Sequence, residues 1–298
     1  MMALASDFER NRPRLLGIAY RMLGTLTDAE DLLQDAWLKW QRVDMTTIDN
    51  PDAYLTTVVS HLCLDRLQQE QNRRQRYTGP WLPEPIIDSD YLSAQALTEY
   101  AEDLSFALLL TLERLTPLER AVFILREVFD HSYPEITSIL GRSEVAVRQL
   151  ASRARRSVTD ARPGKRASTA QHQQLLSAFL QATAEGDVEA LTKLLARDAV
   201  LTSDGGGIKL AALRPIFGAE KIIRFLVAVF HRKLDPRAQV SGWLGLVNGQ
   251  PSLVASVNNQ LEQLLTIDCS DDRINHIYIV RNPHKLVRVS ETVAEKLS

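Results

Sequence analysis

The 298-residue sequence predicts a multidomain chain in which two small all-α domains are followed by an α+β domain. Two observations predict this fold class. Helical spacing with capping signals covers most of the first 160 residues, whereas β-like runs separated by Asn-Gly and Asp-rich turns dominate near the end. Helices followed by an antiparallel meander are typical of an α+β architecture. Arg162-Pro163-Gly164-Lys165 has linker composition and separates the two patterns.

Composition excludes several classes of protein. Hydrophobic residues make up 45% and charged residues 24% of the chain, which excludes disorder throughout. A formal net charge of −2 excludes a wholly basic histone-like chain and a long acidic tail. Cys63 and Cys269 are too few for a disulfide framework and lack CxxC spacing for zinc. No secretory signal or membrane-spanning stretch is recognised, so we expect a cytoplasmic chain with no metal, cofactor or membrane partner.

The first all-α domain is expected over residues 1–78 and contains three helices. The first helical stripe ends at Gly24, and Thr27 with Glu30 has the spacing of a capping box for the second helix. Asn50-Pro51 supplies a cap followed by a first-turn proline, which predicts the start of the third helix.

Acidic residues gather on one face of the second helix. Three aspartates recur there at i, i+3 and i+7, and further polar residues lie beside them. The face consists of Asp28, Glu30, Asp31, Gln34 and Asp35. It could dock a basic protein surface, but a solvated face with favourable carboxylates at a helix N-terminus explains the spacing equally well. Both interpretations stay open at this point.

Residues 79–104 break the helical pattern and are expected to link the two all-α domains. Three prolines within residues 79–85 make that segment stiff and extended, and Trp81 and Leu82 are its apolar anchors. We hypothesise that the C-terminal domain binds this linker and so sets the distance between the all-α domains. The alternative is that Trp81 merely covers the nearest core.

The second all-α domain is expected over residues 105–160 and has a helix-turn-helix signature. Thr116 and Ser132 each begin a capping box, Gly141 ends a short helix, and Ser143 caps a longer one. The second helix of such a motif enters the major groove of DNA.

Charge supports DNA binding by that long helix. Residues 141–166 contain eight basic and two acidic residues, a net charge of +6 that suits phosphate contacts. Val145, Leu150 and Ala154 are expected to face inward. The expected DNA-binding residues are Arg142, Ser143, Glu144, Arg148, Gln149, Ser152, Arg153, Arg155 and Arg156. The alternative is a solvated basic face on an ordinary helix pair.

The α+β domain is expected over residues 171–286, after a linker at 161–170 and before a tail at 287–298. A helix is predicted at about 219–232. Strands are predicted at 199–202, 239–247, 252–258, 261–268 and 273–280.

These residues resemble a known family. Asp28 to Trp37 looks like the core-binding helix of region two in bacterial sigma factors, and Thr116 to Arg156 looks like their region four. The short segment between the regions is similar to that of the extracytoplasmic-function group. Trp81-Leu82-Pro83-Glu84-Pro85 and the α+β domain resemble the subgroup with a fused SnoaL-like domain, which implies an NTF2-like cone.

The resemblance implies roles for individual positions. The acidic face would contact the clamp helices of the largest RNA polymerase subunit, and the beta flap would be a second contact on the core enzyme. The loop at 44–50 and the helix after it would open and read the minus-ten element of promoter DNA. The minus-ten residues would be Asn50, His61, Arg66 and Arg73. The helix from Ser143 would read the minus-thirty-five element.

Two motifs of the α+β domain would regulate the factor, and each departs from the subgroup pattern. The Asp-Gly-Gly-Gly-Lys motif stands here as Asp204-Gly205-Gly206-Gly207-Ile208-Lys209, with the lysine displaced by one position. The Asn-Pro-Asp-Lys-Leu motif stands as Asn282-Pro283-His284-Lys285-Leu286. A shift of one residue in a strand turns a side chain to the other face, so contact between Lys209 and the linker is open.

An enzymatic role for the α+β domain is the weaker hypothesis. NTF2-like cones host isomerases and cyclases that use an Asp base or an Asp–His pair. Asp204, Asp268, His231 and His276 are the candidates, and each has an ordinary structural explanation. We therefore expect no enzyme, but a sigma factor that directs core polymerase to promoters and is modulated by its fused domain. The alternative is a ligand-sensing DNA-binding regulator, or an NTF2-like isomerase or cyclase joined to a helix-turn-helix, and a small ligand in the NTF2-like pocket is left open.

Overall fold

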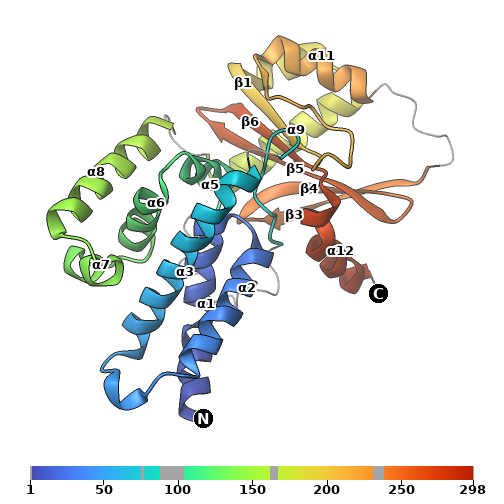
Figure 1. The fold of residues 1–298 in the computed structure, drawn as a ribbon. Helices are drawn as coiled ribbons and strands as arrows, with labels where there is room; N and C mark the ends of the chain where they lie inside the picture. Colours follow the sequence, from blue (N-terminus) through green and yellow to red (C-terminus); the bar gives the residue numbers. More distant parts are fainter. Residues whose placement is uncertain (1, 75–76, 88–103, 162–166, 231–237, 298) are drawn as a thin grey trace. The chain divides into compact units, whose positions relative to one another are not determined.

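The structure of the chain, a computed structural model, describes residues 2–74, 77–87, 104–161, 167–230 and 238–297 (Figure 1). It divides into two compact units. The helical unit combines residues 1–75 with 89–163, and the α+β unit combines residues 76–88 with 164–298. Residues 76–88 therefore belong to the α+β unit, although they lie between the two helical regions in sequence.

The first region of the helical unit has three long helices and one short turn. These are α1 Met2–Leu23, α2 Leu26–Trp40, η1 Met45–Thr47 and α3 Pro51–Arg74. Their shared core includes Leu15, Leu33, Trp40 and Leu55, which are fully buried. Asn50 caps α3 as predicted, because its Oδ1 accepts a hydrogen bond from the Ala53 amide at 3.1 Å.

The predicted cap of α2 is wrong by two residues. Thr25, and not Thr27, is the N-cap, and its hydroxyl accepts a hydrogen bond from the Asp28 amide. The helix begins earlier because Leu26 packs into the core, whereas Thr27 is exposed. Tertiary burial thus decided between two threonines with similar local signals.

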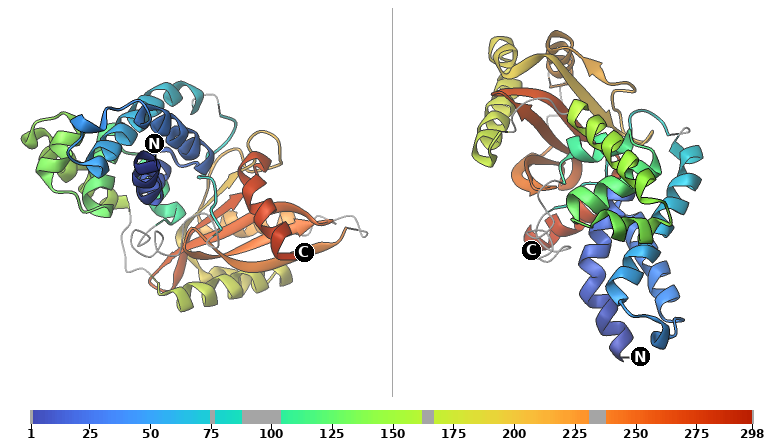
Figure 2. Two further views of the ribbon diagram at one scale, coloured as in Figure 1. Left: turned by 90° about the horizontal axis from the view of Figure 1, so that it is seen from below. Right: turned by 90° about the vertical axis from the view of Figure 1, so that its left-hand side faces the viewer.

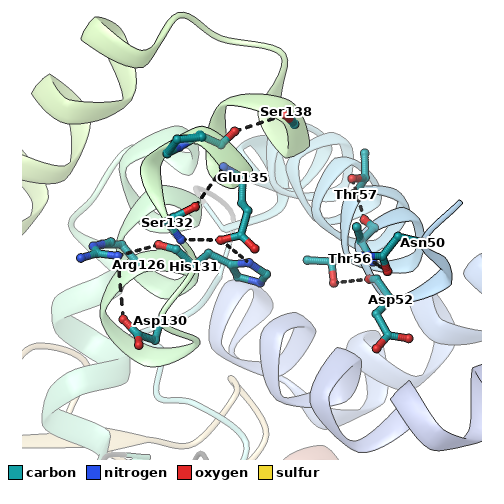
Figure 3. A network of polar contacts seen from close by, with 12 residues as sticks. Asn50, Asp52, Thr56, Thr57, Arg126, Asp130, His131, Ser132, Glu135 and Ser138 are labelled. Atoms are coloured by element: carbon teal, nitrogen blue, oxygen red, sulfur yellow. Dashed lines mark hydrogen bonds and ion pairs between the residues drawn. The ribbon is translucent and has the colours of Figure 1, made fainter.

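The second region of the helical unit has the predicted helix-turn-helix. Its elements are α5 Phe106–Glu113, α6 Pro117–Phe123, the π-helical turn η2 Ile124–Val128, α7 Tyr133–Leu140 and α8 Glu144–Ala161. The capping boxes at Thr116 and Ser132 are both formed, and Figure 3 shows the second one, in which Ser132 and Glu135 bond reciprocally. Gly141 ends α7 in the left-handed conformation with φ of 60°.

The inward face of α8 differs from the prediction at Val145. This side chain is 66% exposed, because Ser143 caps the helix and Val145 falls in its open first turn. Leu150 and Ala154 are buried as predicted, and they belong to the face of α8 that packs against α6. The buried residues of α8 are Val147, Leu150, Ala151 and Ala154.

The α+β unit is built on one six-stranded sheet with the order β2-β1-β6-β5-β4-β3. Its strands are β1 Leu195–Asp204, β2 Ile216–Phe217, β3 Val240–Val247, β4 Gln250–Val257, β5 Gln260–Ser270 and β6 Arg273–Val280. All five predicted strands are present, and β3 to β6 form the predicted antiparallel meander. The parallel pairing of β1 with β6 was not predicted, because it joins segments far apart in sequence.

Four helices accompany the sheet: α9 Thr169–Glu185, α10 Val188–Leu194, α11 Ala219–Phe230 and α12 Pro283–Leu297. Helices lie along the sheet (Figure 2), and side chains of α9, α10 and α11 share one apolar core with β1, β5 and β6. Cross-strand pairs such as Ile267 with Ile277 point into this core and fill it.

Helices extend into both segments that were expected to flank this domain. At the segment expected to be a linker, 161–170, α8 ends at Ala161 and α9 begins at Thr169 after its N-cap Ser168. The tail expected at 287–298 is largely helix α12, whose Leu286 and Val289 are buried. Arg162 to Arg166, His231 and the side chain of Arg73 lie outside the described residues, as do positions 88–103 of the predicted interdomain linker.

Candidate promoter-binding surfaces and linker site

The surface of α8 carries the residues predicted to bind DNA. All nine residues predicted to bind DNA, which lie between Arg142 and Arg156, are exposed. Three of the arginines pair with carboxylates: Arg148 with Glu144 at 2.6 Å, Arg153 with Glu119 at 2.8 Å, and Arg155 with Glu127 at 2.7 Å. Exposed pairs of this kind contribute about 0–1 kcal/mol, so phosphate oxygens can replace the carboxylates at little cost.

Two further arginines on this surface have no competing carboxylate. Arg142 in the turn and Arg156 on α8 form no ion pair within the part of the chain that the structure describes. Arg148 also lies over the ring of Tyr133 at 4.4 Å, which fixes its position near the turn. The surface therefore offers both free and exchangeable cations.

The acidic face of α2 is divided by the structure. Asp31, Gln34 and Asp35 are exposed, whereas Asp28 and Glu30 are half-buried. Asp28 pairs with Arg66 of α3 at 2.8 Å and also contacts the cap Thr25. The exposed three remain available for a partner, while Asp28 connects two helices.

The two tryptophans of α2 both have partners in α1. Trp40 is fully buried and donates its Nε1–H to the carbonyl of Leu4 at 2.9 Å. Trp37 packs against Phe8 with ring centroids 5.1 Å apart. Both tryptophans pack α2 against α1, and they do not extend the acidic face.

The residues expected to read the minus-ten element mostly have protein partners here. Asn50 caps α3, Arg66 pairs with Asp28, and the Nε2 atom of His61 lies 2.8 Å from the Ile139 carbonyl of α7. The helix α3 thus packs against the helix-turn-helix within the helical unit. Figure 3 shows the first turn of α3 and the start of α7 in this arrangement.

His131 joins the same two regions. Its Nε2 lies 2.5 Å from Nη2 of Arg14 on α1. A guanidinium can only donate, so this nitrogen accepts and the ring is neutral. Burial and the neighbouring Arg14 lower the pKa of His131, and the more distant Glu135 and Asp130 oppose that shift.

The linker segment, residues 77–87, binds the sheet of the α+β unit (Figure 1). The amide of Leu82 donates to Oδ2 of Asp204 at 2.9 Å. Ile86 and Asn248 exchange two hydrogen bonds, from the Ile86 amide to Asn248 Oδ1 and from the Asn248 amide to the Ile86 carbonyl. Residues 82–87 are buried, so the linker forms part of the unit's interior.

Four side chains form a linker-binding cluster: Tyr77, Asp204, Asn282 and Lys285. The Lys285 ammonium lies 2.7 Å from Oδ2 of Asp204 and also donates to the Leu82 carbonyl. Tyr77 donates to Oδ1 of Asp204 at 2.7 Å and accepts from Asn282 at 2.8 Å. Burial, and the carboxylate that its hydroxyl contacts, raise the pKa of Tyr77, which keeps this donor protonated.

The glycine run and Trp81 complete this site. Gly206 has φ of 63°, and a Cβ at this position would lie 2.5 Å from the Asn282 side chain, so only glycine fits. The Lys285 ammonium lies 4.3 Å from the Trp81 ring centroid, a cation–π contact on the linker itself. Trp81 therefore contacts Lys285 of the Asn282–Leu286 motif.

Lys209 does not bind the linker. Its side chain is 41% exposed and pairs with Glu262 at 2.7 Å, and Arg281 contacts the same carboxylate. The displaced lysine thus lies in a surface network, while the lysine of the second motif contacts the linker. Tyr77 was missed from the sequence, because a lone tyrosine before a proline-rich segment has no periodic or spacing signal.

The structure describes three of the four candidate catalytic residues, and they lie in two separate places. Asp204 belongs to the linker-binding cluster. Asp268 and His276 face each other across β5 and β6, but on the side of the sheet opposite Ile267 and Ile277, which face the core. No cluster of three or more His, Cys, Asp or Glu side chains suited to a metal occurs among the described residues, and none of the described helices is long and apolar enough to cross a bilayer.

Comparison with known proteins gives the family. The model of sigma-70 region 2 matches residues 8–73, and the model of sigma-70 region 4 matches residues 105–158. The ECF RNA polymerase sigma factor SigJ of Mycobacterium tuberculosis is 37% identical over 290 residues, covering 94% of this chain and 92% of SigJ. The chain belongs to the ECF RNA polymerase sigma factors.

Further similarities extend over the whole length of this ECF sigma factor. SigI of Mycobacterium tuberculosis is 30% identical over 286 residues, covering 95% of this chain and 94% of SigI. The crystal structure of Mycobacterium tuberculosis SigJ has a TM-score of 0.73 and 34% identity, covering 95% of this chain and 98% of that one. The predicted fold class, two helical sigma regions followed by an α+β domain, is confirmed. As a sigma factor, the protein binds RNA polymerase core and promoter DNA, and acts in transcription rather than as an enzyme.

Proposed function

We propose that the α+β domain modulates promoter recognition by binding the linker between the two sigma regions. The observation that carries this proposal is the buried pair of Asp204 and Lys285, which contacts the linker backbone at Leu82 from both sides. Region two precedes the linker segment in sequence and region four follows it. A linker whose middle is bound has less free length to separate the two regions, so its binding limits the promoter spacings that they can reach.

Individual contacts with polymerase and promoter complete the proposal. The helix α8, with Arg142 and Arg156, reads the minus-thirty-five element, and residues 44–50 with α3 read the minus-ten element. The exposed acids of α2 meet the clamp helices of the largest polymerase subunit, and the second helical region meets the beta flap. Charge supports this division, because α2 exposes Asp31 and Asp35, whereas most of the exposed charged residues of α8 are arginines.

Transcription in vitro with promoters of varied spacing tests the role of the linker. Promoters selected by the wild-type holoenzyme from a library are rebuilt with spacers one and two base pairs shorter or longer. The double variant D204N/K285M removes both buried charges and retains an oxygen that accepts from the Leu82 amide. We expect it to transcribe from a broader range of spacings than the wild type, because the linker loses the Lys285 contact and is bound less tightly. The matched control is K209M, which alters an exposed lysine that does not contact the linker.

Identical spacing profiles for the wild type and the double variant would reject linker control. Core binding, measured by co-purification with polymerase, is expected to be unchanged in both variants. The same assay separates the sigma factor from the alternative, a ligand-sensing regulator, because such a regulator binds DNA alone and needs no core enzyme.

A further inference from the structure

A groove on the α+β unit lies outside the linker-binding cluster and outside the filled core. It has a volume of about 890 Å³ and lies among α10, α11, β2 and the adjoining parts of β1 and β6. Such a volume is within the range of small-molecule sites in proteins. The structure thus contains a second concave site whose residues the linker does not use.

The interior of the groove is apolar. Leu195 and Ile223 form its buried floor, and Val188, Phe217 and Val227 contribute to its sides. Phe217 is 63% exposed and Val188 is 53% exposed. Exposed large apolar side chains around one concavity indicate a surface that gains stability when an apolar group covers it.

The lining is also strongly cationic. It includes Arg197, Lys221, Arg224 and Arg273 against one acidic residue, Glu220. Arg224 lies 3.9 Å from Glu220, whereas Arg197 and Lys221 form no ion pair with any residue the structure describes. Two uncompensated cations beside apolar walls would stabilise an anionic head group attached to an apolar chain.

We infer that this groove binds a single-chain anionic amphiphile, with its aliphatic chain against Ile223, Val227 and Phe217 and its carboxylate held by Arg197 and Lys221. The volume of about 890 Å³ favours a small molecule over a long peptide or nucleic-acid strand. Charge favours an anion, because four cations oppose one carboxylate. The site is independent of the linker-binding cluster, so it goes beyond the function proposed above.

Calorimetric titration of the full-length protein tests this inference. Sodium decanoate is the probe, used below its micellar concentration. Decyltrimethylammonium has the same chain with the opposite charge, and acetate has the head group without the chain. We expect saturable binding of one decanoate, and binding of both comparison compounds weaker by at least about tenfold.

Surface variants locate the binding site. The double variant R197E/K221E reverses the two cations, and F217S removes apolar contact at an exposed position, so both are expected to fold, as circular dichroism will check. Each should weaken decanoate binding by at least about tenfold, whereas K193E, a single charge reversal on α10 outside the groove, should change it less than about twofold. Three results would overturn the inference: no saturable binding up to about 1 mM, equal binding of the cationic compound, or wild-type affinity in both groove variants.

Discussion

Lys285 and Asp204 form an ion pair that is almost completely shielded from water. Their Nζ and Oδ2 atoms are 2.7 Å apart, and the side chains are 9% and 0% exposed. Each charge compensates the other in a position where neither could stay hydrated. The pair therefore links the Asp204–Lys209 motif to the Asn282–Leu286 motif, and both to the linker backbone at Leu82.

Removing the Lys285 ammonium should destabilise the α+β unit strongly. The variant K285M leaves the buried Asp204 carboxylate without its cation, and breaking a buried pair in this way typically costs about 3–5 kcal/mol. Urea denaturation of the full-length protein measures the loss. The variant K209M is the control, because its pair is partly exposed and should contribute less than about 1 kcal/mol. Equal losses in the two variants would contradict this assignment.

Thr25 and Thr27 offer a test of helix capping. The variant T25A removes the hydroxyl that accepts from the Asp28 amide, and we expect it to destabilise the helical unit by about 1 kcal/mol. The variant T27A changes an exposed residue within the first turn and should alter stability by less than about 0.5 kcal/mol. Thermal or urea unfolding of both variants measures the loss of stability in each. A larger loss in T27A than in T25A would indicate that Thr27 is the cap, as predicted from the sequence.

Charge reversal on the helix-turn-helix should weaken promoter binding in a salt-dependent manner. For R142E and R156E we expect lower affinity of the holoenzyme for a selected promoter fragment and a salt slope reduced by about 1 per lost phosphate contact. Fluorescence anisotropy at several salt concentrations measures both quantities. The variant K193E reverses a surface charge in the α+β unit and serves as the control, so an equal effect there would indicate nonspecific electrostatics.

His131 should make the helical unit less stable in mild acid. Its pKa is lowered in the folded chain, so the unfolded chain binds the proton more readily. The contribution of the neutral ring is fully present above the unfolded pKa of about 6.5 and is lost as the pH falls below it. Urea unfolding between pH 7.5 and pH 5.5 measures this decline, which H131N should reduce.

A second buried histidine provides the comparison. His172 lies in the α+β unit, and burial lowers its pKa as well. The variant H172N should therefore leave the pH dependence of the helical unit unchanged. An unaltered pH profile in H131N would mean that another group causes the decline.

Local signals in the sequence predicted much of the fold. The capping boxes at Thr116 and Ser132 and the stop at Gly141 depend on residues within one turn, so spacing alone identified them. Predictions became wrong where burial made the choice, as at Thr27 and Val145. The parallel pairing of β1 with β6 escaped prediction because both strands could be recognised singly, but no turn joins them.

The candidate sites show the same limit. The basic and acidic faces follow from charge and helical period, and exposure of α8 agrees with the predicted set. The linker-binding cluster depends on contacts across 81 to 205 residues, which no local pattern reports. The motif residues Asp204 and Lys285 were named from the sequence, but their mutual contact and the participation of Tyr77 required the structure.

The distance in sequence between Leu82 and Lys285 has a consequence during synthesis. These residues are 203 positions apart, so at about 5–20 residues per second the ribosome makes the second about 10–40 s after the first. Both sigma regions are translated before the lysine that holds the linker exists. Each newly made molecule therefore passes through a period in which its linker lacks the Lys285 contact, and a nascent chain can meet polymerase before its α+β domain is complete.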